Sequence, residues 1–167
     1  PNPNTPFKQG HFFSKEHRLA MVECLILNTF GQDSRVSVSD VEINGDVSGY
    51  SIDTMAYYRR LYPKEMFYFV LGMDAVMTLG KWKSYRELLG MVTFLVFGRD
   101  GYILDSVKDY LGNVFGPRFS EHFIFLDHDR VPVSSTFVRE KIQEGMSFQG
   151  VLPDSVYDYI LDKGLVA

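Results

Sequence analysis

The sequence predicts a single α/β domain built on a parallel sheet. Apolar runs with the length of buried strands occur at residues 66–72, 93–99 and 122–127, and helical patterns separate them. Such an alternation of strand and helix favours βαβ units, because parallel strands need a crossover connection. The 167 residues, 46% of them hydrophobic, suffice for one core, and no repeat or linker divides them.

The first elements are predicted as helix, strand and helix. Residues 14–29 carry apolar side chains at helical spacing, and Ser14 is placed to cap this helix. Residues 35–43 roughly alternate apolar and polar positions, which indicates a strand with one bulge. A loop with two glycines leads to the helix predicted over 51–61.

The middle of the chain carries the three apolar runs. Residues 66–72 end in Gly and are typical of a strand buried on both faces. Short helical pieces flank residues 80–83 before the second strand, 93–99. A helix over 105–112 separates that strand from the third, 122–127.

Two helices close the chain. The first is predicted from SSTFVREKIQEG and ends at Gly145. The second has Pro153 at its front and Gly164 at its end, which is the usual asymmetry of Pro and Gly about a helix.

Composition excludes several classes of function. The net charge is −4 and no Lys/Arg-rich run occurs, so no nucleic-acid partner is expected. The single cysteine, Cys24, cannot form an internal disulfide, and a reducing cytoplasm is the expected location. No apolar run approaches the roughly 20 residues that cross a bilayer, so no membrane partner is expected.

The candidate sites follow the strands. Ligands of parallel α/β sheets lie beyond the carboxyl ends of the strands. The stretches that leave the three predicted strands are GMDAV, GRDGY and VPVSST. We therefore expect these three stretches to converge on one edge of the sheet.

The front of the helix after the third strand carries three hydroxyls and an arginine. Ser134, Ser135, Thr136 and Arg139 would suit a phosphate, because helix N-termini and Arg both favour anions. The alternative is an ordinary hydroxyl cap with a solvated Arg139.

The other candidates also have two interpretations. Gly72 and Asp74 would suit a ribose, or would form a turn that caps the next helix. Trp82, the one tryptophan, would stack on a flat ligand beside Lys83, or would pack in the core. The stretch that begins at Tyr50 would hold a carboxylate at a helix front, or would only cap that helix.

These stretches, in this order, resemble the bacterial nicotinate-nucleotide adenylyltransferases of the nucleotidyltransferase superfamily, whose fold is Rossmann-like. The resemblance covers nearly the whole chain. It rests on PNPNTPFKQ, HRLAM, GYSIDT, FVLGMDAV, GKWKSY, VFGRDGY, VPVSSTFVR and LPDSVYDYILDKGL.

The resemblance implies transfer of the adenylyl group of ATP to nicotinate mononucleotide, which gives nicotinate adenine dinucleotide and pyrophosphate. It implies Mg²⁺ with the ATP. The four histidines show no metal-ligand spacing and there is one cysteine, so no metal site of the protein's own is expected. It assigns ATP binding to Gly72, Asp74, Ser135, Thr136 and Arg139, and catalysis to Ser134, Ser135, Thr136 and Arg139. It assigns nicotinate mononucleotide binding to Lys8, Tyr50, Ser51, Trp82, Lys83 and Arg99, with Trp82 stacked on the pyridine ring.

The family's first strand and its H-x-G-H loop have no counterpart in this sequence. We therefore expect residues 1–167 to be a single nucleotidyltransferase domain that is partial at its N-terminus, and nearly inactive alone. Three alternatives stay open. They are a nucleotide-binding fragment without catalysis, a sister enzyme that uses nicotinamide mononucleotide, and a structural or interaction protein. Oligomeric state is not predicted.

Overall fold

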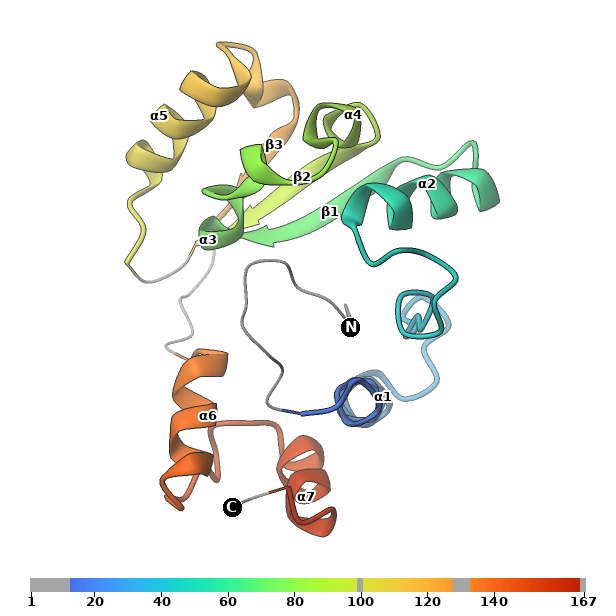
Figure 1. Cartoon of the computed structure of the whole chain (residues 1–167), viewed down its shortest axis with the longest axis vertical. Coiled ribbons are helices and arrows are strands. Elements are labelled where there is room, and N and C mark those ends of the chain that lie inside the picture. The colour runs from blue at the N-terminus through green and yellow to red at the C-terminus, as the bar shows by residue number, and fades with distance from the viewer. Residues whose placement is uncertain (1–12, 99–100, 128–132, 166–167) are drawn as a thin grey trace. The chain divides into compact units, whose positions relative to one another are not determined.

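The computed structural model describes residues 13–98, 101–127 and 133–165. The chain, drawn in Figure 1, forms two compact units. Each unit has its own hydrophobic core. Unit 1 combines residues 1–49 with residues 133–167, and unit 2 is the continuous segment 50–132. The prediction of a single domain over 1–167 stays a prediction.

Unit 2 contains the predicted parallel sheet. Its strands are β1 (Phe67–Gly72), β2 (Val92–Phe97) and β3 (Phe123–Leu126), in the order β1-β2-β3. Its helical segments are α2 (Ser51–Leu61), α3 (Met73–Val76), the 3₁₀ turn η1 (Leu79–Lys81), α4 (Tyr85–Leu89), α5 (Leu104–Phe115) and the 3₁₀ turn η2 (Phe119–Glu121). The three strands and the helices between them confirm the predicted alternation, while the 3₁₀ turns η1 and η2 were not predicted.

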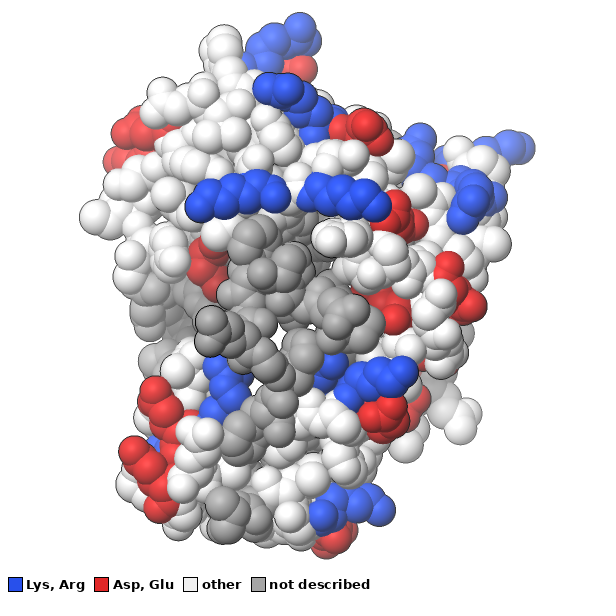
Figure 2. All heavy atoms as spheres, in the orientation of Figure 1, with Lys and Arg blue, Asp and Glu red and all other residues white. Residues whose placement is uncertain are grey.

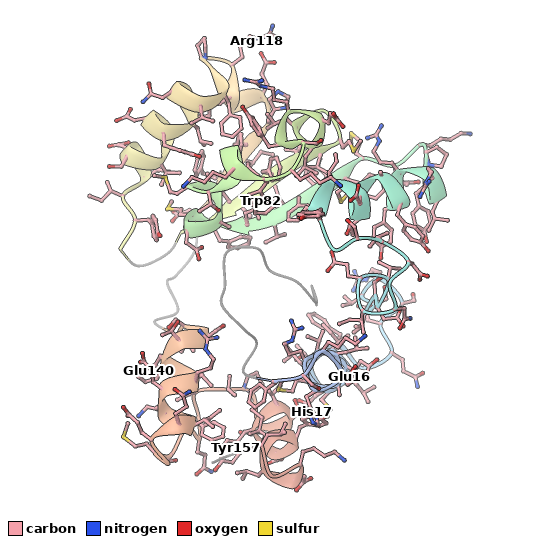
Figure 3. The ribbon with its side chains drawn as sticks, viewed as in Figure 1. Glu16, His17, Trp82, Arg118, Glu140 and Tyr157 are labelled. Atoms are coloured by element: carbon pink, nitrogen blue, oxygen red, sulfur yellow. The ribbon has the colours of Figure 1, made fainter. Side chains whose placement is uncertain are left out.

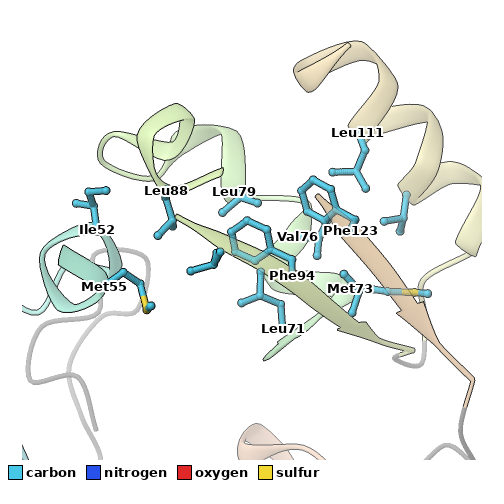
Figure 4. Packing of buried hydrophobic residues seen from close by; sticks show 13 residues of the cluster. Ile52, Met55, Leu71, Met73, Val76, Leu79, Leu88, Phe94, Leu111 and Phe123 are labelled. Atoms are coloured by element: carbon cyan, nitrogen blue, oxygen red, sulfur yellow. The ribbon is translucent and has the colours of Figure 1, made fainter. Parts of the chain in front are cut away.

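The core of unit 2 lies on one face of the sheet. Phe94 of β2 is fully buried and stacks on Phe123 of β3, with ring centroids 5.1 Å apart. Leu79, Leu88 and Leu111, which come from η1, α4 and α5, are also fully buried in this cluster (Figure 4). The helical segments of unit 2 therefore bury this face.

The prediction that β1 is buried on both faces is wrong. Phe67, Phe69 and Leu71 pack on the core, but Tyr68 and Val70 are 53% and 60% exposed. Successive side chains of a strand point to opposite faces, and the core cluster lies against only one of them. The continuous apolar run in the sequence concealed this alternation, because Tyr and Val are common on both faces of strands.

The strand predicted over 35–43 is also absent from the described structure. Instead, residues 40–46 turn tightly: the N–H groups of Ile43 and Asn44 donate to the carbonyl of Asp40, at 2.7 and 2.9 Å. The Asn44 side chain also donates to the Asp40 carboxylate at 2.7 Å. These local hydrogen bonds satisfy groups that a strand would have paired with a neighbour.

Unit 1 is helical. It consists of α1 (Lys15–Phe30), α6 (Ser135–Gln143) and α7 (Asp154–Asp162), and all three helices were predicted. As predicted, Ser14 caps α1 by accepting from the N–H of His17 at 3.3 Å. The core contains the buried residues Val138, Ile142, Phe148, Val156 and Ile160.

The two segments of the chain that form unit 1 meet where α1 packs against α7. Met21 and Leu25 of α1 pack against the core cluster of unit 1. A hydrogen bond of 2.9 Å joins Nδ1 of His17 in α1 to the Tyr159 hydroxyl in α7. It therefore links the two chain segments of unit 1, which are far apart in the sequence. The predicted helix ends also hold, because Gly145 and Gly164 adopt positive φ angles of 65° and 59° after α6 and α7.

Candidate functional site

The carboxyl ends of the three strands lie at one edge of the sheet. Gly72 is paired with Phe97, and Phe97 is paired with Leu126, so the strands end in register. We expected the three stretches after the strands to converge on one edge of the sheet. The pairing confirms that the strand ends that precede these stretches lie at one edge. Residues 99–100 and 128–132 lie outside the described residues, and so does the predicted site residue Arg99.

The first stretch beyond this edge leaves β1 directly into a helical turn. Gly72 is in extended conformation and precedes α3, whose first turn contains Asp74. Met73 points into the core and is buried. The positions of Gly72 and Asp74 at the strand end are as predicted, whereas their contact with ATP stays a prediction.

Trp82 packs against the core of unit 2, as one of its two interpretations predicted. Trp82 directly follows η1 (Figure 3). Its ring packs edge to face on Phe69 of β1, with centroids 6.2 Å apart. Its Nε1 donates to Oγ1 of Thr78 at 3.3 Å. The residue is partly buried against the core of unit 2, and its stacking on a ligand stays a prediction.

The stretch from Tyr50 to Thr54 and the stretch around Trp82 meet through Lys83. The Lys83 ammonium forms an ion pair of 2.9 Å with the Asp53 carboxylate. It also lies over the Tyr50 ring, 4.8 Å from the centroid. Lys83 and Asp53 are 30 residues apart in the sequence, and their ion pair joins two segments that are predicted to bind the same nucleotide.

Ser51 and Tyr50 define the start of α2. Tyr50 is the N-cap residue, and its carbonyl accepts from the N–H groups of Asp53 and Thr54 at 3.0 and 3.1 Å. Ser51 is the first residue of the helix. A helix front beside a lysine is a suitable place for a carboxylate, because the first N–H groups of a helix carry partial positive charge.

The front of α6 belongs to unit 1. Ser134 is the N-cap residue, and its Oγ accepts from the N–H of Phe137 at 3.1 Å. The capping interpretation of Ser134 is therefore confirmed. Arg139 is not simply solvated, because its guanidinium donates to Oγ1 of Thr136 at 3.1 Å. This contact turns Arg139 back toward the helix front, where an anion would lie.

Sequence reasoning missed two residues of this site. Asp53 had a weak signal, since it is an acidic residue in the first turn of α2. The sequence signal for Thr78 was weaker: it lies four residues before Trp82. Lys8 was predicted to contribute to the site and lies outside the described residues.

Charge and metal-ligand chemistry add little to the described part of the site. On the face shown in Figure 2, basic and acidic side chains are intermixed. Among the described residues no group of three or more His, Cys, Asp or Glu gathers as a metal site would require.

None of the described helices is both long and apolar enough to span a membrane.

Comparison with known proteins defines the class first. The model of the cytidylyltransferase-like family matches residues 1–141. The chain is therefore a nucleotidyltransferase-type enzyme of this class, as the resemblance of its sequence led us to expect.

Relatives then define the particular family. The chain is 33% identical to a protein of Shewanella pealeana, over 96% of this chain and 76% of the relative. It is 30% identical to a protein of Clostridium tetani, over 99% of this chain and 80% of the relative. Both are named "Probable nicotinate-nucleotide adenylyltransferase". The chain belongs to the nicotinate-nucleotide adenylyltransferases within the cytidylyltransferase-like family.

Solved structures support the fold. Nicotinic acid mononucleotide adenylyltransferase of Plasmodium falciparum, complexed with NaAD, superposes with a TM-score of 0.69 at 19% identity. That match covers 98% of this chain and 78% of the other. The same enzyme complexed with APC gives a TM-score of 0.66 at 20% identity, over 91% and 75% of the two chains. The predicted Rossmann-like α/β fold is confirmed.

Proposed function

We propose that this enzyme transfers the adenylyl group of ATP to nicotinate mononucleotide, giving nicotinate adenine dinucleotide and pyrophosphate. The observation that carries the proposal is the junction of Tyr50, Asp53, Lys83 and Trp82 in a chain of this family. The indole ring of Trp82 offers a stacking surface, and the first N–H groups of α2 offer partial positive charge. Nicotinate mononucleotide has an aromatic ring and a carboxylate that match these two features.

On the acceptor side, Trp82 stacks on the pyridine ring. The backbone at Tyr50, Ser51 and Lys83 receives the carboxylate. Because Asp53 already neutralises the Lys83 ammonium, the side chain of Lys83 serves mainly to hold the two segments together. The family resemblance adds Lys8 and Arg99 near the acceptor phosphate.

On the ATP side, Gly72 and Asp74 hold the adenosine part at the end of β1. Ser135, Thr136 and Arg139 bind the phosphates at the front of α6, and Ser134 shapes that front as its cap. An arginine can bind two phosphate oxygens at once, and the helix dipole favours their negative charge.

The chemistry needs no covalent intermediate. A phosphate oxygen of nicotinate mononucleotide attacks the α-phosphorus of ATP, the bond from that phosphorus to the bridging oxygen breaks, and pyrophosphate leaves. Positioning of the two nucleotides and neutralisation of the charge that develops on the leaving group lower the barrier. Arg139 and the N–H groups at the front of α6 supply this charge.

We propose that Mg²⁺ enters with ATP as part of the substrate. Mg²⁺ commonly retains water and binds through substrate phosphates rather than in an all-protein cage. When bound, it neutralises negative charge on the phosphate oxygens. We also propose a cytoplasmic location, which the single unpaired Cys24 suits and which fractionation of the source cells would test.

The test is pyrophosphate release from ATP, measured with nicotinate mononucleotide and with nicotinamide mononucleotide as the acceptor. We expect the enzyme to turn over with nicotinate mononucleotide and to prefer it to nicotinamide mononucleotide. A preference for the amide would identify the sister activity. Thermal stabilisation by the nucleotides without turnover would indicate a non-catalytic binding protein. Neither stabilisation nor turnover in a folded protein would contradict the proposal and favour a structural role.

A further inference from the structure

We propose that Thr78 is a positioning residue that holds the indole ring of Trp82 in the orientation required to stack on the acceptor's pyridine ring. The inference rests on the proposed function, because the ring's task is the one assigned to it there. Thr78 itself is not proposed to contact either nucleotide.

The Thr78 hydroxyl both donates and accepts a hydrogen bond. It donates to the carbonyl of Ala75 at 2.9 Å, and it accepts from Nε1 of Trp82 at 3.3 Å. A hydroxyl has one proton, and the indole N–H can only donate. Because the hydroxyl proton of Thr78 is donated to the Ala75 carbonyl, a lone pair of the hydroxyl oxygen accepts the N–H of Trp82.

The backbone that carries Trp82 is held independently. The N–H of Trp82 donates to the carbonyl of Leu79 at 3.0 Å, and that of Gly80 donates to the Tyr110 hydroxyl of α5 at 3.4 Å. A Cβ at Gly80 would lie 2.9 Å from Cγ1 of Val114, so η1 approaches α5 closely there. The freedom that remains to Trp82 is therefore mainly the rotation of its side chain.

The apolar contact of the ring does not fix that rotation. The ring packs on Phe69 at an interplanar angle of 69°, and an edge-to-face contact can be made by either edge of an indole. A flip of the ring would carry Nε1 away from Thr78. The hydrogen bond to Thr78 distinguishes the two orientations, whereas Phe69 does not.

The expected consequence concerns binding of the acceptor rather than chemistry. A ring that is already oriented loses less conformational freedom when the pyridine stacks on it. Loss of the Thr78 hydroxyl is expected to raise KM for nicotinate mononucleotide by about three- to tenfold, as befits one neutral hydrogen bond. KM for ATP and kcat should change by less than about twofold, because Thr78 contacts neither reacting group.

The test compares Thr78→Val, which keeps the shape and loses the hydroxyl, with Thr78→Ser, which keeps the hydroxyl. Trp82 is the single tryptophan of the chain, so its fluorescence anisotropy decay reports this ring alone. We expect added fast motion in the ligand-free Thr78→Val protein and wild-type decay in Thr78→Ser, with KM following the same pattern. If Thr78→Val does not fold, Thr78→Ala replaces it.

Wild-type anisotropy and wild-type KM in Thr78→Val would overturn the proposal. Faster ring motion with unchanged KM would also overturn it, because Thr78 would then hold the ring without serving the acceptor. If the wild-type enzyme does not use nicotinate mononucleotide at all, the proposed function fails and the positioning role fails with it. The anisotropy of the ligand-free protein shows separately whether Thr78 holds the ring.

Discussion

Arg139 lies one turn into α6, and its guanidinium donates to Thr136 near the front of the same helix. This contact holds one nitrogen of the guanidinium against a hydroxyl in the first turn of α6. An arginine fixed in this way is prepared to bind two oxygens of a phosphate group, which a lysine cannot do with the same geometry.

We predict that Arg139→Lys lowers kcat by about 10²-fold while KM for nicotinate mononucleotide changes little. The substitution keeps the charge but loses the planar fork that we propose stabilises the leaving pyrophosphate. Steady-state kinetics with each substrate varied in turn will measure both constants. The matched control is Lys141→Met, which removes a full charge from the same helix. A comparable loss in the control would show that general electrostatics, not the fork, matters.

Residue contacts across the fold were the least predictable part of the site. The sequence indicates Tyr50, Lys83 and Trp82 as candidates because of their types and their neighbours. It does not indicate that Asp53 pairs with Lys83, since that pairing depends on where α2 packs in unit 2. The contact of Thr78 with Trp82 likewise requires the 3₁₀ turn between them, whose short extent has no clear pattern in the sequence.

At the scale of elements, Ser134 serves two roles that can be separated. As the cap of α6 it accepts from the N–H of Phe137 at 3.1 Å. As a candidate catalytic residue it stands at the proposed phosphate site. Glycine retains most of the stability of an N-cap, whereas alanine does not.

We predict that Ser134→Ala lowers the free energy of unfolding by about 1 kcal/mol and that Ser134→Gly lowers it by only a few tenths. Both variants lose the hydroxyl, so both should lose activity to the same extent if the hydroxyl binds phosphate. Urea unfolding and turnover will give the two quantities. Ser14→Ala, which removes the cap of α1, is the control that should lose stability alone. Activity that follows stability across all three variants would contradict a catalytic role for Ser134.

Helices were predicted better than strands for a physical reason. A helix satisfies its hydrogen bonds within one segment, so caps such as Ser14 and Pro153 mark its ends in the sequence. A strand requires a partner. Residues 35–43 alternate as a strand would, yet they bond locally around Asp40. The strands β1, β2 and β3 were recognised because each coincides with a continuous apolar run in the sequence.

At the scale of the whole molecule, two separate cores lead to a prediction about local stability. Ile160 is 1% exposed in the core of unit 1, and Leu111 is fully buried in the core of unit 2. Truncation of either to Ala costs about 2–5 kcal/mol by leaving a cavity. We expect each loss to appear mainly in the unit that contains the cavity.

Hydrogen exchange read by mass spectrometry will test this. Ile160→Ala should accelerate exchange in α1, α6 and α7 and leave β1, β2 and β3 protected, whereas Leu111→Ala should do the reverse. The two variants serve as controls for each other, because each removes a buried aliphatic side chain of the same size. Equal acceleration throughout the chain in both variants would mean that the two units unfold as one.

The division of unit 1 into two chain segments has a consequence for synthesis on the ribosome. Tyr159 of α7 lies 142 residues after its hydrogen-bond partner His17 of α1. At about 5–20 residues per second, α1 is made roughly 7 to 30 seconds before the helix that covers it. Unit 2 is continuous and can complete its core within that interval. During translation the nascent chain therefore exposes the apolar face of α1, with Met21 and Leu25, to chaperones and to neighbouring nascent chains.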